Sequence, residues 1–279
     1  MNSEKLKGFV QLTRPVNCLI AFLSIVAASI IAGAKEDLWF KTIIAGFVGA
    51  FVAAGANAIN DYFDVEIDRI NRPDRPIPRK AVSREEARFL WLVLSFVGLG
   101  LNIVLNQRAL AIALVAVISL YFYSMVLKRT VLMGNIVVAV MTALAFAYGA
   151  VVVGKIERAL MPALFAFLIN FAREVVKDIE DVEGDAKKGA KTLAVRYGPK
   201  SGIAAASAAL VALIGATIAA YVLGIYSALY LYIVIVVDGI LVFVLVSLWS
   251  NQSTPNMRRM STVLKANMAI GLVAIFAGS

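Results

Sequence analysis

The sequence predicts an all-α integral membrane protein with nine transmembrane helices in one bundle. Hydrophobic residues make up 61% of the 279 residues, whereas they make up roughly 45–50% of a soluble globular domain. Charged residues make up only 16%, compared with roughly 25% in soluble proteins, and the mean hydropathy is +0.84. This composition argues against a soluble enzyme, a nucleic-acid-binding module or a disulfide scaffold.

Apolar runs long enough to cross a bilayer, about 20 residues as a helix, recur along the chain. The nine runs lie near 16–34, 39–59, 86–105, 109–127, 131–153, 159–176, 201–223, 227–249 and 261–278. The first run could instead be a signal peptide, because Lys5, Lys7 and Arg14 precede it and small residues end it. Its length and the membranous runs after it favour a span, and we expect a single polytopic domain over 1–279.

The basic residues support this count of spans independently. If the N-terminus is inside, few of the 27 Lys and Arg residues fall in outside connections. Those few are Lys35, Lys41, Arg108, Lys155 and Arg158. Such an imbalance is what the positive-inside rule predicts. We therefore expect a multi-pass protein of the cell membrane with its N-terminus inside and its C-terminus outside.

The side-chain inventory restricts the chemistry that this chain can perform. It contains no histidine and one cysteine, Cys18, which excludes an intrachain disulfide, a Cys- or His-ligated metal and a Ser-His triad. Catalysis would have to use carboxylates, basic groups, amides or tyrosines.

Acidic residues gather in a first cluster at the end of the second span. At about 100° per residue, one arc holds four polar side chains if the helix continues past the membrane boundary, while Glu66 lies on the opposite face. The four are Asn60, Asp61, Asp64 and Asp68.

A second acidic cluster follows the sixth span, on the same predicted side of the membrane. One face of a helix there would carry Glu174, Asp178, Asp181 and Asp185. Lys177 and Lys188 flank this face.

Two acidic faces on one membrane side are most simply explained by cations between them, since like charges on one helical face repel. Oxygen ligands without His or Cys indicate Mg²⁺ or a similar hard ion, which is typically bridged to substrate phosphates. The alternative is an ordinary solvated face beside the membrane.

A proline-rich segment, 71–80, connects the first cluster to the third span. Its three prolines between 73 and 78 rule out a helix and stiffen the loop. Arg72, Arg75 and Arg79 supply planar, permanently charged donors suited to oxyanions. An ordinary positive-inside loop is the alternative interpretation.

These segments resemble the UbiA-type intramembrane prenyltransferases. Residues 60–68 and 71–76 are similar to that family's first signature, Asn-Asp-x-x-Asp-x-x-x-Asp followed by Asn-Arg-Pro-x-Arg-Pro. Asp181-x-x-x-Asp185, with Lys188-Gly189 and Lys191-Thr192 after it, resembles the second acidic motif. Within the family the chain looks most like archaeal members that make ether lipids. The stretches that carry this likeness are 13–18, 63–68 and 173–181. Arg79-Lys80 departs from the Ser-Gly of many relatives.

The resemblance implies a Mg²⁺-dependent prenyltransferase with two metal ions and an active site on the cytoplasmic side. It would transfer a geranylgeranyl group from geranylgeranyl diphosphate, the isoprenyl diphosphate donor, to the free hydroxyl of geranylgeranylglyceryl phosphate, a lipid-soluble acceptor. No nucleic acid would take part. Prenylation of an aromatic quinone or chlorophyll-type acceptor, another lipid phosphate enzyme and a divalent-cation transporter stay open as alternatives.

The resemblance also assigns roles to individual residues. The expected metal ligands are Asn60, Asp61, Asp64, Asp68, Asp178, Asp181 and Asp185, of which Asp64, Asp68, Asp181 and Asp185 would be catalytic. The expected substrate contacts are Arg14, Asn17, Arg72, Arg75, Tyr123, Lys128, Arg129 and Lys177. The motif loops would span about 60–85 and 173–198. Asp238, the one acid deep in a span, would either act directly or hydrogen-bond a neighbouring helix.

Overall fold

The computed structural model describes residues 3–187 and 189–279, and of Asn71 it describes the backbone. Lys188, expected beside the second acidic cluster, lies outside the described residues. Within the described part of the chain the regular elements are all helical. Nine of these helices are long and apolar enough to cross a membrane. The predicted fold class and number of spans are confirmed to that extent.

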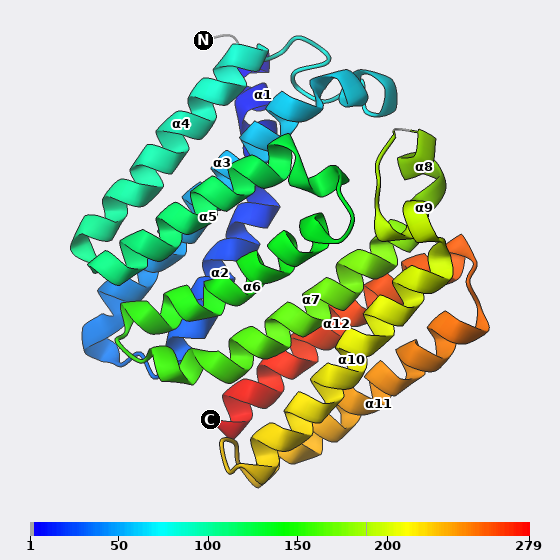
Figure 1. Cartoon of the computed structure of the whole chain (residues 1–279). Helices are drawn as coiled ribbons and strands as arrows, with labels where there is room; N and C mark the ends of the chain where they lie inside the picture. The colour runs from blue at the N-terminus through cyan, green and yellow to red at the C-terminus, as the bar shows by residue number, and fades with distance from the viewer. Residues whose placement is uncertain (1–2, 188) are drawn as a thin grey trace. The chain divides into compact units, whose positions relative to one another are not determined.

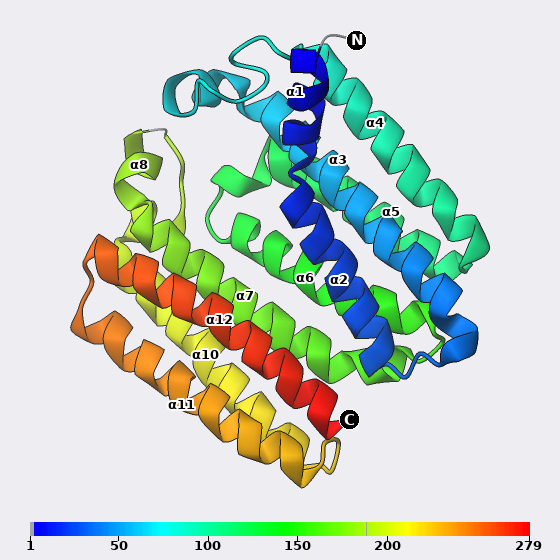
Figure 2. The same cartoon turned by 180° about the vertical axis from the view of Figure 1, so that it is seen from behind.

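The described chain divides into two compact units (Figures 1 and 2). Unit 1 comprises Met1–Leu127 and Leu144–Ala159, and unit 2 comprises Lys128–Ala143 and Leu160–Ser279. Unit 1 contains α1 (Ser3–Thr13), α2 (Pro15–Ile31), η1 (Glu36–Leu38), α3 (Trp39–Asn71), α4 (Arg84–Gly100), η2 (Leu101–Val104), α5 (Gln107–Met125) and η4 (Ile156–Ala159). Unit 2 contains α7 (Leu160–Glu180), α8 (Val182–Lys187), α9 (Leu193–Tyr197), α10 (Pro199–Val222), α11 (Ala228–Ser250) and α12 (Thr254–Gly278). Helix α6 (Met133–Val152) and the short η3 (Leu127–Arg129) contribute to both.

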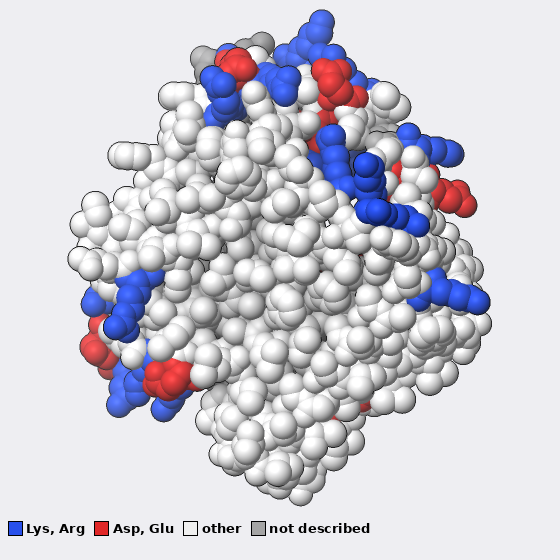
Figure 3. Space-filling model, in the orientation of Figure 1, with Lys and Arg blue, Asp and Glu red and all other residues white. Residues whose placement is uncertain are grey.

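In unit 1 the long helix α3 packs against α2, α4 and α5. The core here is built from small and branched side chains such as Ala45, Val48 and Ala109, with Tyr148 of α6 among them. In the face shown by Figure 3, charged side chains of this unit gather over the ends of its helices and the surface between them is uncharged. Such an uncharged belt is what a helix bundle needs where it meets hydrocarbon.

In unit 2, α7 packs against α10 and α12, and α11 packs against α10 and α12. Figure 1 shows these four helices lying side by side along their lengths. The side chains between them are apolar, including Val176, Leu210, Leu241 and Leu264.

The N-terminal segment forms a helix of its own that the sequence analysis did not expect. Helix α1 buries Gly8 and Leu12 and ends at Thr13. Arg14 then adopts a left-handed backbone conformation, with φ of 50°, and Pro15 begins α2 at a position where its fixed φ suits a helix.

Helix α3 continues well beyond the membrane boundary, as the first acidic cluster requires. Its 33 residues make a helix about 50 Å long, which exceeds the roughly 30 Å of hydrocarbon. The helix ends at Asn71, because Pro73 disfavours a helical conformation at Arg72. The segment from 72 to 83 contains no regular helix, as its prolines predicted. Ser83 and Glu86 then form a capping box that begins α4.

Helix α12 begins at Thr254, earlier than the expected 261. Ser253 lies at its N-cap and a proline occupies the first turn, which is a favourable way to begin a helix. The polar residues between Asn256 and Arg259 hid this first turn from a hydropathy-based prediction.

Candidate functional site

The end of α3 presents the first acidic cluster as one strip. The Asn60 amide donates a hydrogen bond to Asp64, with 3.0 Å between Nδ2 and Oδ2. The carboxylates of Asp64 and Asp68 both lie close enough to Asp61 to interact with it electrostatically. Glu66 lies on another face of the helix, where it pairs with Arg69. The predicted shared arc is therefore confirmed as a local geometry, and this strip comprises Asn60, Asp61, Asp64 and Asp68.

Arg75 of the proline-rich loop ties the two most buried carboxylates of the strip together. Its Nη1 lies 3.1 Å from Oδ1 of Asp61 and 2.5 Å from Oδ2 of Asp68. Asp61 is 4% exposed and Asp68 is 5% exposed. Charges this far from water are stable only when they are paired, so Arg75 fixes both the loop and the strip.

Arg14, at the junction of α1 and α2, reaches the same strip. Its Nη2 lies 2.6 Å from Oδ1 of Asp61, and its Nη1 lies 3.3 Å from Oδ1 of Asn57. The amide of Asn57 in turn donates to the carbonyl of Thr13 at 2.9 Å. These bonds hold the left-handed residue Arg14 in place. Sequence reasoning gave Asn57 no role, although this amide lies about one turn before the acidic strip.

The structure places the other predicted contacts of unit 1 near this end of the unit. Arg72 is exposed just after α3, and Asn17 is exposed in the first turn of α2. Tyr123 is half-buried in the last turns of α5. The contacts of all these side chains with a substrate stay predictions, as do those of Arg14 and Arg75, whose observed partners are carboxylates.

An aromatic cluster lies beside the strip. The ring of Tyr121 on α5 is 5.5 Å from that of Phe63 on α3 and 5.1 Å from that of Trp91 on α4. Phe122 adds a further edge contact to Tyr121 at 5.8 Å. Three helices therefore bring aromatic rings together at the end of unit 1 that carries the strip.

In unit 2 the second acidic cluster extends from α7 into α8. Helix α7 ends at Glu180 and α8 begins at Val182, yet the helical hydrogen bonding passes through Asp181. The Asp181 amide donates to the Lys177 carbonyl and the Asp185 amide donates to the Asp181 carbonyl, both at 2.9 Å. The expected single face is therefore largely kept despite the break.

Asp178 is held by an amide that sequence reasoning missed. Nδ2 of Asn135, in the first turn of α6, lies 2.9 Å from Oδ2 of Asp178. Asn135 is 6% exposed. An amide in the first turn of an apolar span marks Asn135 as a candidate, but the sequence does not show that its partner is Asp178. The carboxylates of Glu174 and Asp185 also lie close enough to Asp178 to interact with it electrostatically.

Basic groups surround this second cluster. Lys177 contacts Glu174, with 3.4 Å between Nζ and Oε2, and Arg173 donates to the same carboxylate at 2.6 Å. The Lys191 amide donates to the Arg129 carbonyl at 3.0 Å. That bond joins η3, which carries Lys128 and Arg129, to the segment that follows the second motif.

Asp238 hydrogen-bonds a neighbouring helix, which was one of the two expected alternatives. The Thr217 hydroxyl on α10 lies 3.0 and 3.1 Å from the two carboxylate oxygens of Asp238 on α11. Tyr230 donates to the Thr217 carbonyl at 3.2 Å. This network pins α10 to α11.

The strip on α3 and the second acidic cluster each offer oxygen ligands, but neither offers enough of them to enclose an ion. Over residues 3–187 and 189–279, no group of three or more Cys, Asp or Glu side chains lies close enough to hold a metal ion alone. This arrangement fits Mg²⁺, which commonly uses one or two carboxylates and completes its coordination with water and substrate phosphates.

The chain is similar to known proteins over nearly its whole length. A model of the UbiA prenyltransferase family matches residues 21–270. Digeranylgeranylglyceryl phosphate synthase of Methanopyrus kandleri is 39% identical over 98% of this chain and 99% of its own. The synthase of the same name from Thermococcus gammatolerans is 41% identical over 97% of each chain.

Solved structures agree with these sequence relatives. A structure described as digeranylgeranylglyceryl phosphate synthase in membranes aligns with a TM-score of 0.88 and 32% identity, covering 99% of this chain and 98% of that one. A UbiA homologue from Archaeoglobus fulgidus, bound to GPP and Mg²⁺, shares the fold at a TM-score of 0.73 and 19% identity, over 96% and 99% of the two chains. This chain is therefore a multi-pass membrane protein that belongs to the UbiA prenyltransferase family.

Proposed function

We propose that this enzyme forms digeranylgeranylglyceryl phosphate, by transferring a geranylgeranyl group from geranylgeranyl diphosphate to the free hydroxyl of geranylgeranylglyceryl phosphate. The observation that carries the proposal is the similarity to synthases of that name, at 39% and 41% identity over 97–98% of this chain. The two acidic helix ends supply the chemistry that a diphosphate substrate needs.

The two units would act as one prenyltransferase domain over 1–279, with motif loops at about 60–85 and 173–198. We place the N-terminus and both loops on the cytoplasmic side and the C-terminus outside. The concentration of Lys and Arg in the connections assigned to the inside supports this orientation.

We propose that two Mg²⁺ ions bind when the diphosphate does. The ligands would be Asn60, Asp61, Asp64, Asp68, Asp178, Asp181 and Asp185, with Asp64, Asp68, Asp181 and Asp185 the most important for catalysis. When bound, Mg²⁺ would supply positive charge that stabilises the leaving diphosphate oxygens. The oxygen donors of the two clusters, with Asn60 beside Asp64 and Asn135 beside Asp178, support this assignment.

Arg75 can serve the strip and a phosphate at the same time. Both of its bonds to carboxylates use Nη1, which leaves donors on Nη2 and Nε for diphosphate oxygens. Arg72, Lys128, Arg129 and Lys177 would add further positive charge around the diphosphate. Arg14 and Asn17 would be suited to a phosphate on the acceptor.

The aromatic cluster would protect the reacting carbon. Loss of diphosphate from an allylic carbon leaves a cation that water would quench. Rings such as Phe63 and Tyr121 exclude water and can stabilise a nearby positive charge through their faces, as Tyr123 would also do.

The test is a comparison of acceptors with the purified full-length protein, Mg²⁺ and geranylgeranyl diphosphate. We expect product with geranylgeranylglyceryl phosphate and none with a hydroxybenzoate. Asp64→Ala and Asp181→Ala should abolish turnover while the protein keeps its melting temperature. Glu66→Ala and Glu183→Ala are the matched controls, because these acids lie within two positions of Asp64 and Asp181 in the sequence but are not among the proposed metal ligands. Both variants should stay active. Turnover of the hydroxybenzoate alone would overturn the proposed acceptor, and an active Asp64→Ala or Asp181→Ala variant would remove that residue from the metal site.

A further inference from the structure

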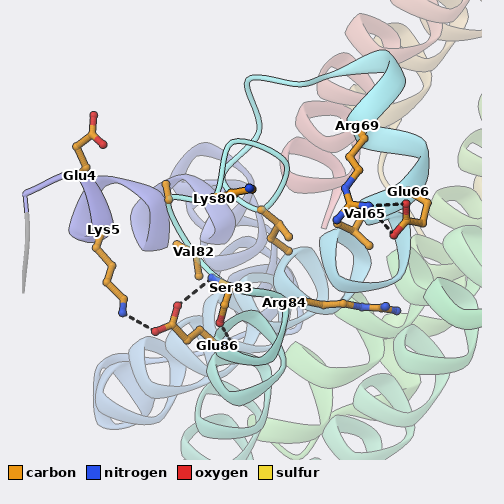
Figure 4. A pocket seen from close by; sticks show the side chains of 12 residues that line it. Glu4, Lys5, Val65, Glu66, Arg69, Lys80, Val82, Ser83, Arg84 and Glu86 are labelled. Carbon is orange, nitrogen blue, oxygen red and sulfur yellow. Dashed lines mark hydrogen bonds and ion pairs between the residues drawn. The ribbon is translucent and has the colours of Figure 1, made fainter.

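A pocket of about 670 Å³ lies in unit 1, apart from the acidic strip (Figure 4). It is formed by α1, the last turns of α3, the segment between α3 and α4, and the start of α4. Its apolar part includes Val65, Ile77 and Val82, which belong to one buried cluster. The strip residues Asp61, Asp64 and Asp68 do not line it, so it is a separate site.

Four cationic side chains line this pocket, and two of them already have carboxylate partners. Lys5 lies 2.5 Å from Glu86, and Arg69 lies 2.9 Å from Glu66. Figure 4 shows both pairs as dashed contacts on the pocket wall. The charges within each of these pairs cancel. Glu4 is the one other acid that lines the pocket, so the remaining cations, Lys80 and Arg84, outnumber the remaining acid and favour an anionic ligand.

The remaining two cations, Lys80 and Arg84, make no ion pair with the residues that the structure describes. Nε of Arg84 donates to the Tyr62 carbonyl at 3.2 Å, and the guanidinium lies 4.4 Å from the centre of the Tyr62 ring. These contacts orient the guanidinium and leave its two terminal nitrogens as donors. An oriented guanidinium whose terminal donors are still available is well suited to a phosphate.

Lys80 occupies a backbone conformation that favours glycine. Its φ is 63°, in the left-handed region, where a long side chain is sterically disfavoured. Such a conformation is uncommon in a residue other than glycine, asparagine or aspartate, so the segment holds Lys80 in place at some cost. Its side chain is an ammonium group at the edge of the pocket.

We propose that this pocket binds the phosphate headgroup of an anionic membrane glycerophospholipid. Arg84 would contact the phosphate and Lys80 would contact the headgroup from the edge of the pocket, while the apolar floor around Val65 and Val82 would accept the glycerol and the first chain carbons. The surroundings favour a lipid over a free ion. Leu6 on α1 is 52% exposed and Phe89 on α4 is 67% exposed, so both helices that border the pocket present large apolar side chains on their outer surfaces.

A bound lipid would brace the segment that carries Arg75. Lys80 lies in the same connection as Arg75, and the Lys80 amide donates to the Ile77 carbonyl at 3.0 Å. A headgroup held between Lys80 and Arg84 would therefore join this connection to α4 and would steady the residue that pairs with Asp61 and Asp68.

The experiment measures lipid binding to the delipidated full-length protein in detergent, independently of prenyl transfer. Native mass spectrometry and thermal melting would compare short-chain phosphatidylglycerol, phosphatidylcholine and inorganic phosphate. We expect phosphatidylglycerol to bind more tightly than phosphatidylcholine and to raise the melting temperature. Inorganic phosphate at the same concentration should do neither.

The variants separate binding from folding. Lys80→Gly should weaken phosphatidylglycerol binding at least tenfold, yet melt in the absence of lipid at or above the wild-type temperature, because glycine accepts this backbone conformation. Arg84→Gln should weaken binding similarly. Lys35→Ala, which removes an exposed charge between α2 and α3, should bind like the wild type.

Three results would overturn the proposal. Unchanged phosphatidylglycerol binding by a Lys80→Gly and Arg84→Gln double variant would remove the pocket as the site. Equal binding of phosphatidylcholine would remove the role of the anionic charge. Equal protection by inorganic phosphate would assign the pocket to a free anion in place of a lipid.

Discussion

Replacing Arg75 by alanine should destabilise unit 1 strongly, because one guanidinium nitrogen serves two buried carboxylates. Removing one partner of a buried ion pair costs about 3–5 kcal/mol. The Arg75 side chain is 17% exposed and Asp61 keeps Arg14 as a second partner, so we expect the lower end, about 3 kcal/mol. That corresponds to a fall in melting temperature of about 6–12 °C for a protein of this size.

The assay is thermal unfolding of the purified protein in detergent, followed by intrinsic fluorescence. Arg79→Ala is the matched control, because Arg79 lies in the same loop, is exposed, and its side chain bonds the neutral side chain of Gln11. It should change stability by no more than about 0.5 kcal/mol. The double variant Arg75→Ala, Asp68→Asn should recover part of the loss, since it no longer buries an unpaired charge. If Arg75→Ala and Arg79→Ala melted within a degree of each other, the bridge would not hold this end of the protein together.

The remaining predictions concern metal use and the strained loop. Asn135→Ala removes the donor to Asp178 and should raise the Mg²⁺ concentration for half-maximal activity at least about tenfold, as loss of a ligand's supporting hydrogen bond does. Asn170→Ala removes an amide that bonds the Ala166 carbonyl one turn earlier in the same helix, and it should leave that Mg²⁺ concentration unchanged. Chelation of divalent ions should abolish turnover, and added Mg²⁺ should restore it; turnover in excess chelator would contradict the proposed metal dependence. Lys80→Gly should stabilise the lipid-free protein by up to about 1 kcal/mol, because relief of the left-handed strain outweighs the added freedom of the unfolded chain; a lower melting temperature would show that the lysine is not strained.

The first acidic strip could be predicted from the local geometry of a helix alone. Asn60, Asp61, Asp64 and Asp68 share an arc because a helix turns by a fixed angle per residue, and the structure keeps that helix intact to Asn71. The loop from 72 to 83 was predictable for an equally local reason, since proline cannot continue a helix. The early start of α12 could not be predicted in this way, because its first turn is polar and a hydropathy pattern detects only the apolar part of a span.

The partners of the acidic residues could not be predicted. Arg14 meets Asp61 across 47 positions of the chain and Asn135 meets Asp178 across 43. Such pairs form only when particular helices pack, and many arginines and amides in this sequence could have supplied the same bond. The separate helix α1 also depends on packing, because it is stabilised by burial of Gly8 and Leu12 against unit 1.

The sequence by itself determined the membrane class, the number and order of the spans, and the kinds of side chain available for chemistry, because these depend on composition and spacing along the chain. Only the tertiary structure decided which face of each helix is buried. Apart from Asp238, the middle of helix α11 is apolar on both its buried and its exposed face: Val234 and Leu241 are buried while Ile235 and Phe243 are exposed. In a bilayer both faces of such a helix meet an apolar environment, so hydropathy cannot distinguish them and the fit between neighbouring helices must.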